Sequence, residues 1–153
     1  ILGQKATVRE FLSTKFMQKR LPLIMEAVVG AGVPHCVLMS AYGVGDTVRS
    51  ASFLMRVACK TIMRSIFRDR AKADAMVAKY QPYISRALPG RLTDEPGKGG
   101  AKVVDVTSVA HVPGIPTIAR EDVADALLDI AGDPLNAGTD FLVTIEDVVI
   151  RAA

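Results

Sequence analysis

The fold of this chain is decided by residues 34–43, which run Pro34-His35-Cys36-Val37-Leu38-Met39-Ser40-Ala41-Tyr42-Gly43. The four apolar residues of 36–39 are typical of a parallel strand that is buried on both faces. Ser40 follows directly, at the end where open α/β sheets bind their ligands. We therefore expect Ser40 to lie at a ligand-facing loop. The alternative is a serine that only begins a turn.

Helical and strand-like segments alternate on both sides of this stretch. Pro22 fits the first turn of a helix that ends at Gly30-Ala31-Gly32. The expected elements are a helix at 20–30, helical residues 50–79 broken near 67–70, strands at 83–88, 102–106 and 141–145, and a helix at 120–131. This order predicts an α/β fold, with a Rossmann-like parallel sheet flanked by helices. We expect one domain, residues 1–153.

Composition limits the function classes. The chain has 153 residues, of which 50% are hydrophobic, and its net charge of +3 gives no indication of nucleic-acid binding. Cys36 and Cys59 lie in apolar segments, which favours free thiols in a reducing compartment, and we expect a cytoplasmic protein. No apolar run reaches the roughly 20 residues that span a bilayer, so no membrane span is expected.

Two glycine-containing stretches are candidates for phosphate sites. Gly43-Val44-Gly45 begins a dinucleotide fingerprint, but Val48 stands at the third glycine position, and we favour a flexible loop. Residues 97–100, Gly-Lys-Gly-Gly, are interpreted as a turn. Without a glycine fingerprint, we expect the chain to be the second half of a nucleotide-binding domain whose βα units with the fingerprint come before it. The choice between NADH and NADPH stays open.

A basic stripe follows the central strand, at Arg56, Lys60, Arg64 and Arg68. The i, i+4 spacing places these side chains on one helical face. That face could meet an acidic partner, a membrane surface or an anionic ligand, and we favour a solvated face. The residues expected to cover the core instead are Phe53, Val57, Met63 and Phe67.

Other catalytic patterns are not found. His35 and His111 have no Cys, His or acidic partner at ligand spacing, so no metal site is expected. Many short-chain reductases relay a proton through a tyrosine that precedes a lysine by four residues. Here Tyr42, Tyr80 and Tyr83 are followed at that spacing by Asp46, Ile84 and Ala87. A reductase of this kind would take its proton elsewhere.

Three motifs in order resemble one known family. They are Ser40-Ala41-Tyr42-Gly43-Val44-Gly45-Asp46, then Leu88-Pro89-Gly90-Arg91-Leu92-Thr93-Asp94, then Ile118-Ala119-Arg120-Glu121-Asp122-Val123-Ala124. Together they are similar to the atypical short-chain dehydrogenase/reductases, in the NAD(P)H-binding, NmrA-like group that includes biliverdin reductase B (flavin reductase). The resemblance runs from Ile1 to about Ile145. Ile1-Leu2-Gly3-Gln4 is similar to the fourth strand of that family and the loop after it.

The resemblance implies site residues. Leu2, Gly3 and Gln4 would border the ribose and nicotinamide of NADP or NAD. Ser40, Ala41 and Tyr42 would line the nicotinamide and acceptor pocket, with Ser40 as the catalytic residue, and Pro89, Gly90 and Arg91 would form the opposite wall. The chain departs from the family at Leu88, where arginine is frequent, and at Ala119, where serine is common. A lysine that approaches the ribose in the family is matched by Arg70 or Lys72.

The function implied is an NAD(P)H-dependent oxidoreductase that passes hydride to a flavin, a quinone or a similar small conjugated acceptor. Two alternatives remain: a non-catalytic NAD(P)-binding sensor or scaffold, and an inactive truncated fragment. Whether the chain is an enzyme is thus left open. An exposed sheet edge would also allow a homo-oligomer.

Overall fold

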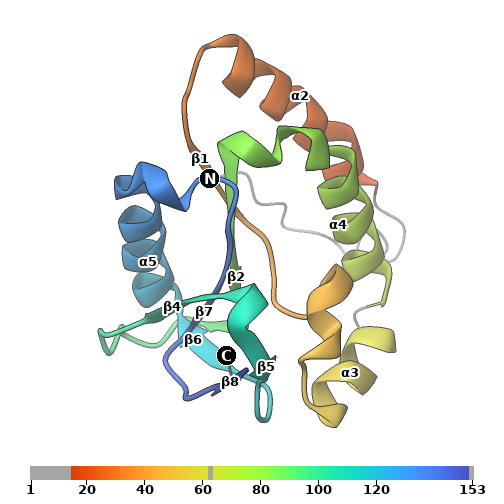
Figure 1. Cartoon of the computed structure of the whole chain (residues 1–153). Helices are drawn as coiled ribbons and strands as arrows, with labels where there is room; N and C mark the ends of the chain where they lie inside the picture. Colours follow the sequence, from red (N-terminus) through yellow and green to blue (C-terminus); the bar gives the residue numbers. More distant parts are fainter. Residues whose placement is uncertain (1–14, 62–63, 152–153) are drawn as a thin grey trace.

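A four-stranded sheet forms the centre of the computed structural model, which describes residues 15–61 and 64–151 (Figure 1). Its strands, in the order β1-β2-β7-β4, are β1 (Cys36–Met39), β2 (Ile84–Pro89), β7 (Asp140–Thr144) and β4 (Lys102–Asp105). β1, β2 and β7 are mutually parallel, whereas β4 pairs antiparallel with β7. The predicted Rossmann-like α/β class is confirmed.

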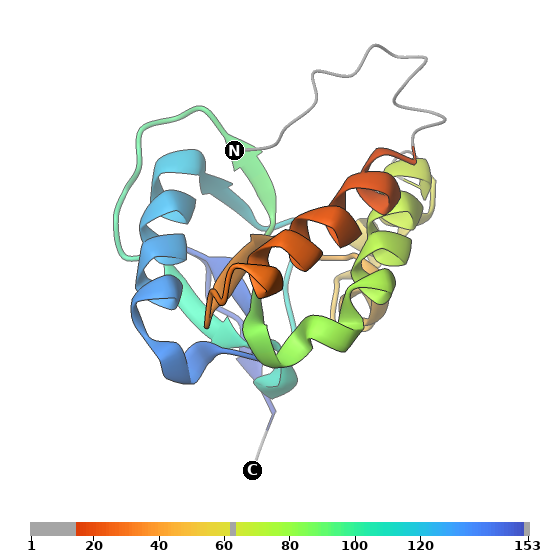
Figure 2. The ribbon, with the colours of Figure 1, turned by 90° about the horizontal axis from the view of Figure 1, so that it is seen from above.

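Helices cover both faces of this sheet, as the view from above shows (Figure 2). α2 (Phe16–Gly30) and α4 (Arg64–Met76) lie on one face, and α5 (Arg120–Gly132) lies on the other. β2 serves both layers because its side chains alternate. Ile84 packs in one hydrophobic cluster with Leu21 and Met25 of α2, whereas Ala87 packs in another with Ile130 of α5.

Shorter elements connect the layers. α3 (Phe53–Lys60) precedes α4. Two small ladders flank the sheet: β3 (Arg91–Thr93) runs parallel to β6 (Thr117–Ala119), and β5 (Val109–His111) runs antiparallel to β8 (Val149–Ile150). The 3-10 turns are η1 (Gly45–Arg49), η2 (Ala78–Tyr83), η3 (Val106–Ser108) and η4 (Pro134–Asn136). Within the described ranges, no helix has the length and apolar character needed to cross a membrane.

Several element boundaries differ from the sequence prediction. β1 has the predicted bounds, and β2 begins and ends one residue later than expected. α2 begins at Phe16, so Pro22 lies inside the helix and not in its first turn. The predicted break near 67–70 is wrong because those residues lie within α4. The chain leaves α3 at Thr61 instead.

The predicted faces of α3 also need correction. The four cations of the basic stripe are exposed, as favoured, but they belong to two helices. Phe53 and Val57 do not cover the core, since they are 82% and 42% exposed. Met55 and Cys59 are buried in their place, in a cluster with Tyr42, while Phe67 packs against that cluster as expected. Met63 lies outside the described residues.

Candidate functional site

The two predicted pocket walls lie side by side at the carboxyl end of the sheet. Beyond the end of β1, the chain keeps pairing with β2: Ser40 N–H donates to Ala87 O at 2.8 Å, and Tyr42 N–H donates to Pro89 O at 2.8 Å. The segment 40–42 therefore runs along the last residues before Gly90. The structure brings these two sequence-predicted groups together. The third group, Leu2, Gly3 and Gln4, lies outside the described residues.

The Ser40 side chain takes part in a buried polar network. Its Oγ donates to Asp74 Oδ2 at 3.0 Å and accepts from Arg70 Nε at 3.1 Å, and Ser40 is 8% exposed. Arg70 also donates to the backbone carbonyl of Met39. A serine hydroxyl has one hydrogen to donate and two lone pairs. Ser40 thus keeps one lone pair for a further donor, and it could donate elsewhere only by leaving Asp74.

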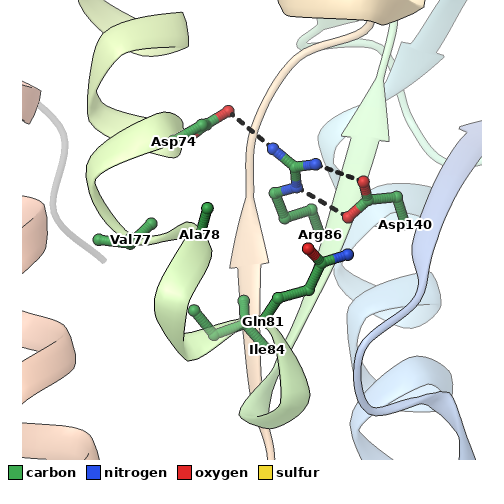
Figure 3. A pocket seen from close by; sticks show the side chains of 7 residues that line it. All are labelled: Asp74, Val77, Ala78, Gln81, Ile84, Arg86 and Asp140. Carbon is green, nitrogen blue, oxygen red and sulfur yellow. Dashed lines mark hydrogen bonds and ion pairs between the residues drawn. The ribbon is translucent and has the colours of Figure 1, made fainter.

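The network continues through Asp74 to β2 and β7. Arg86 Nη1 lies 3.6 Å from Asp74 Oδ2, and Arg86 holds Asp140 through two hydrogen bonds, one of them 2.7 Å from Nε to Oδ1 (Figure 3). The hydrogen bond to Asp140 raises the pKa of Arg86. Burial lowers the pKa of Arg70, an effect that the Asp74 carboxylate opposes. Two guanidinium groups and two carboxylates therefore balance each other beneath Ser40.

A small hollow opens beside this network. It is lined by Asp74, Val77, Ala78, Gln81, Ile84, Arg86 and Asp140 (Figure 3). Its volume is about 40 Å³, whereas pockets for drug-sized ligands measure about 300–1,000 Å³. The hollow contacts the first half of β2, while Ser40 and Gly90 lie past the strand ends. It therefore has too little room for a dinucleotide.

Tyr42 and Gly43 anchor the loop after β1 in the core. Tyr42 is 1% exposed, and its hydroxyl lies 2.9 Å from Ser50 Oγ. Burial raises the pKa of Tyr42. Gly43 has φ = +91°, and an added Cβ would lie 2.9 Å from Cys59 Sγ. Because its ring is buried, a contact of Tyr42 with a ligand would have to come from its backbone. Ala41, which is half-buried, is the more accessible neighbour.

The second wall, predicted to lie opposite Ser40–Tyr42, instead runs beside it and is fixed by a close backbone contact. An added Cβ on Gly90 would lie 2.2 Å from the Pro116 carbonyl oxygen, so only glycine fits here. Arg91 N–H donates to the same oxygen at 2.8 Å. Pro89 is fully buried, while the Arg91 side chain is exposed. Of the three predicted residues in this wall, Arg91 therefore offers an accessible cation, and Pro89 and Gly90 set the shape.

In both glycine-containing loops, backbone N–H groups donate hydrogen bonds to side chains of the same chain. Gly43 N–H donates to Thr47 Oγ1 at 2.9 Å. In the loop before β4, Gly97 N–H donates to Glu121 at 2.8 Å, and Gly99 N–H donates to Asp122 at 2.8 Å. The donors that would hold a phosphate in a fingerprint loop are occupied by side chains here. This agrees with the interpretation of both stretches as loops and turns.

Sequence reasoning missed most of the network. It named Arg70 and Lys72 together, and the structure brings Arg70 to Ser40 while Lys72 is exposed. Asp74 was not singled out, although Arg70 and Asp74 stand at the i, i+4 spacing of helical ion pairs. Arg86 was a second signal, because a charged residue within a buried strand requires an acidic partner.

A family model described as NAD(P)H-binding matches residues 3–134. This chain belongs to the NAD(P)H-binding family. The match includes Ser40–Tyr42, Arg70 and Pro89–Arg91, and it confirms the predicted cofactor class, NADP or NAD. The comparison with curated proteins gave no significant match.

Several solved structures share the fold of this chain. They include ChuY from E. coli CFT073 (19% identity, TM-score 0.67, covering 85% of this chain and 66% of that one). ChuY of E. coli O157:H7, called an anaerobillin reductase, has 19% identity and TM-score 0.64 over 83% of this chain and 57% of its own. A short-chain dehydrogenase/reductase of Veillonella parvula in complex with NADP has 16% identity and TM-score 0.69, covering 86% and 59%. This chain thus spans 57–66% of their lengths.

The donor set at the sheet end fits one part of such a cofactor. Ser40 has a free lone pair, the nearby Arg70 is a partly buried cation, and Arg91 is an exposed one. An acceptor oxygen suits the amino hydrogens of a carboxamide, and guanidinium groups suit hydroxyl or phosphate oxygens. The described glycine loops, by contrast, have N–H donors already bonded. The sheet end therefore offers one acceptor lone pair and two guanidinium groups, whereas the bonded glycine N–H groups offer no phosphate cradle.

Proposed function

We propose that this chain forms the nicotinamide and acceptor side of an NAD(P)H-dependent oxidoreductase, whose hydride goes to a flavin, a quinone or a similar small conjugated acceptor. One observation carries the proposal: the family match includes the two segments, Ser40–Tyr42 and Pro89–Arg91, that run side by side at the end of the sheet. Ligands of open α/β sheets bind at this edge. The name of ChuY from E. coli O157:H7 as a reductase supports the reaction class.

Each residue of the site would have a separate role. Ser40 would accept a hydrogen bond from the carboxamide or the ribose through its remaining lone pair, with Asp74 and Arg70 holding the hydroxyl in place. Pro89 and Gly90 would form the rigid wall beside it, and Arg91 would meet a negative group of the cofactor or the acceptor. Leu2, Gly3 and Gln4 would border the ribose, and Ala41 would face the acceptor.

The chemistry needs little from the protein beyond placement. When bound, NAD(P)H supplies a hydride, and the acceptor takes up this hydride together with one proton. Ser40 already donates its hydrogen to Asp74, and Tyr42 is buried with its hydroxyl beside Ser50. We therefore assign the proton to solvent. The chain's share is to hold the nicotinamide against the acceptor and to exclude water from one side.

The second candidate is a non-catalytic NAD(P)-binding sensor or scaffold. The hydrogen bonds of Ser40 to Asp74 and Arg70 favour it. A buried hydroxyl bound on two sides is suited to recognition and poorly suited to proton donation. The two candidates share the cofactor site and differ in turnover.

Two measurements separate the candidates. Calorimetric titration with NADPH and NADH measures binding, and the rate of NADPH or NADH oxidation with menadione or FMN as acceptor measures turnover. We expect binding, turnover, and a loss of about tenfold or more in kcat/KM for Ser40→Ala. The matched control is Ser108→Ala, which removes a hydroxyl that donates to the Asp105 carbonyl and belongs to neither wall. Binding without turnover would favour the sensor. Absence of binding would contradict both candidates.

A further inference from the structure

α3 exposes apolar side chains to solvent on one face. Phe53 is 82% exposed, Leu54 63% and Val57 42%. Helical geometry places these three residues on the same side of the helix. The opposite side carries Met55 and Cys59, which are buried against Tyr42. Single exposed apolar residues are ordinary, but a cluster on one short helix indicates a surface that contacts another molecule.

The exposed charges on α3 and α4 have one sign, and the exposed carboxylate nearest in sequence, Asp46 of η1, is paired with Arg49. Arg56 and Lys60 lie on α3 itself, and α4 adds Arg64, Arg68 and Lys72, all of them exposed. The only carboxylates in the sequence from Phe53 to Met76 are Asp69 and Asp74. Both are buried, at 6% and 7% exposure. Asp69 accepts hydrogen bonds from Met17 and Gln18, so its charge faces inward.

We propose that this α3–α4 surface, comprising the apolar cluster of α3 and the five exposed cations of the two helices, docks on an anionic lipid surface. The apolar side chains would enter the layer beneath the headgroups, while the arginines and lysines would stay among the phosphates. Figure 1 shows α3 as a short helix at the edge of the molecule, next to α4. A projecting helix can reach a flat surface directly. Cations spread over two helices suit a continuous sheet of headgroups better than a single acidic side chain of a protein partner.

α5 provides an internal contrast. Its Leu128 is 71% exposed, but exposed Asp125 and Asp129 flank it on the same helix. An anionic surface would repel this second apolar site. α5 covers the opposite face of the sheet from α4 (Figure 2). The proposed orientation thus places α3 toward the lipid and α5 away from it.

The test is co-sedimentation of the full chain with vesicles of phosphatidylglycerol and phosphatidylcholine in equal parts, and with phosphatidylcholine alone. We expect the protein to pellet with the anionic vesicles at low salt and to be released at high salt. Phe53→Glu and the double change Arg56→Glu with Lys60→Glu should each weaken binding about tenfold or more. Leu128→Glu is the matched control and should bind like the unchanged protein. All these side chains are exposed, and circular dichroism checks that the variants fold.

Several outcomes would overturn the proposal. Absence of pelleting with anionic vesicles is one, and equal pelleting with the neutral ones is another. Retained binding by Phe53→Glu would remove α3 from the contact. If size-exclusion chromatography shows self-association that Phe53→Glu abolishes and Leu128→Glu does not, the α3 surface binds a second copy of the chain. Saturable capture of an acidic peptide without vesicle binding would assign it to a protein partner.

Discussion

Ser40 Oγ donates a hydrogen bond to Asp74 Oδ2 at 3.0 Å, although 34 positions separate the two residues. This bond joins the residue after β1 to the last turn of α4. It also fixes what Ser40 can offer a ligand, because the hydrogen of the hydroxyl is already committed. The predicted site residue is therefore one member of a buried polar network that includes charged groups.

Of the residues in this network, Asp74 should contribute most to the stability of the fold. Asp74→Asn leaves Arg70 and Arg86 without the carboxylate that lies 3.3 Å and 3.6 Å from them. We expect the free energy of unfolding to fall by about 3 kcal/mol, because breaking a buried ion pair strands the partner charge. Urea denaturation measures this. Asp46→Asn removes an exposed pair with Arg49 and should change little; equal effects of the two changes would contradict the account.

Arg70 should not be replaceable by lysine. Its guanidinium reaches Ser40 Oγ, the Met39 carbonyl and Asp74 together, and an ammonium group cannot reproduce that fork. Arg70→Lys keeps the charge, and we expect it to cost about 1–2 kcal/mol of stability. It should also weaken NADPH binding in calorimetry. The control is Lys72→Arg, an exposed change two residues away. Equal stability and equal NADPH affinity of the two variants would contradict the positioning role of Arg70.

Gly90 tests the backbone contact that shapes the second wall. The added methyl group of Gly90→Ala would lie 2.2 Å from Pro116 O, so the pairing of β3 with β6 must shift. We expect a loss of about 1–3 kcal/mol in thermal or chemical denaturation. Gly30→Ala, at the end of α2, meets no atom within 4 Å and should be neutral or slightly stabilising. A neutral Gly90→Ala would show that the contact is looser than described.

The burial of the two thiols should make the stability of the fold depend on pH. Burial raises the pKa of Cys36 and of Cys59, so folding favours the neutral thiols. This contribution is fully present below the unfolded pKa of about 8.5 and is lost as the pH rises through the higher folded values. Urea midpoints should therefore fall between about pH 7.5 and pH 10. The double change Cys36→Ala with Cys59→Ala should flatten part of that slope; an unchanged slope would show that the thiols do not contribute.

Apolar patterns in the sequence correctly predicted those strands and helices whose bounds depend on nearby residues. β1 has its expected bounds because an unbroken apolar run is set off by Pro34 and Ser40. α5 follows its buried stripe, Val123, Ala126 and Ile130, and ends one residue beyond the predicted limit. The three family motifs pointed to the cofactor class that the family match then confirmed.

Contacts distant in sequence could not be predicted in the same way. The faces of α3 depend on Met55 and Cys59 packing against Gly43, where only a glycine leaves room. A helical pattern alone cannot choose between the Phe53 and Met55 faces. The partners of Ser40 likewise depend on the packing of α4 against the sheet.

Amide chemical shifts recorded during a titration with NADPH test the central claim most directly, that the ends of β1 and β2 form the nicotinamide site. The account predicts that the largest changes fall on Ser40, Ala41, Gly90 and Arg91. Amides around α5 and the loop at 97–100 should move little, because Glu121 and Asp122 already occupy that loop. Saturable changes confined to 97–100, or no changes at all, would contradict it.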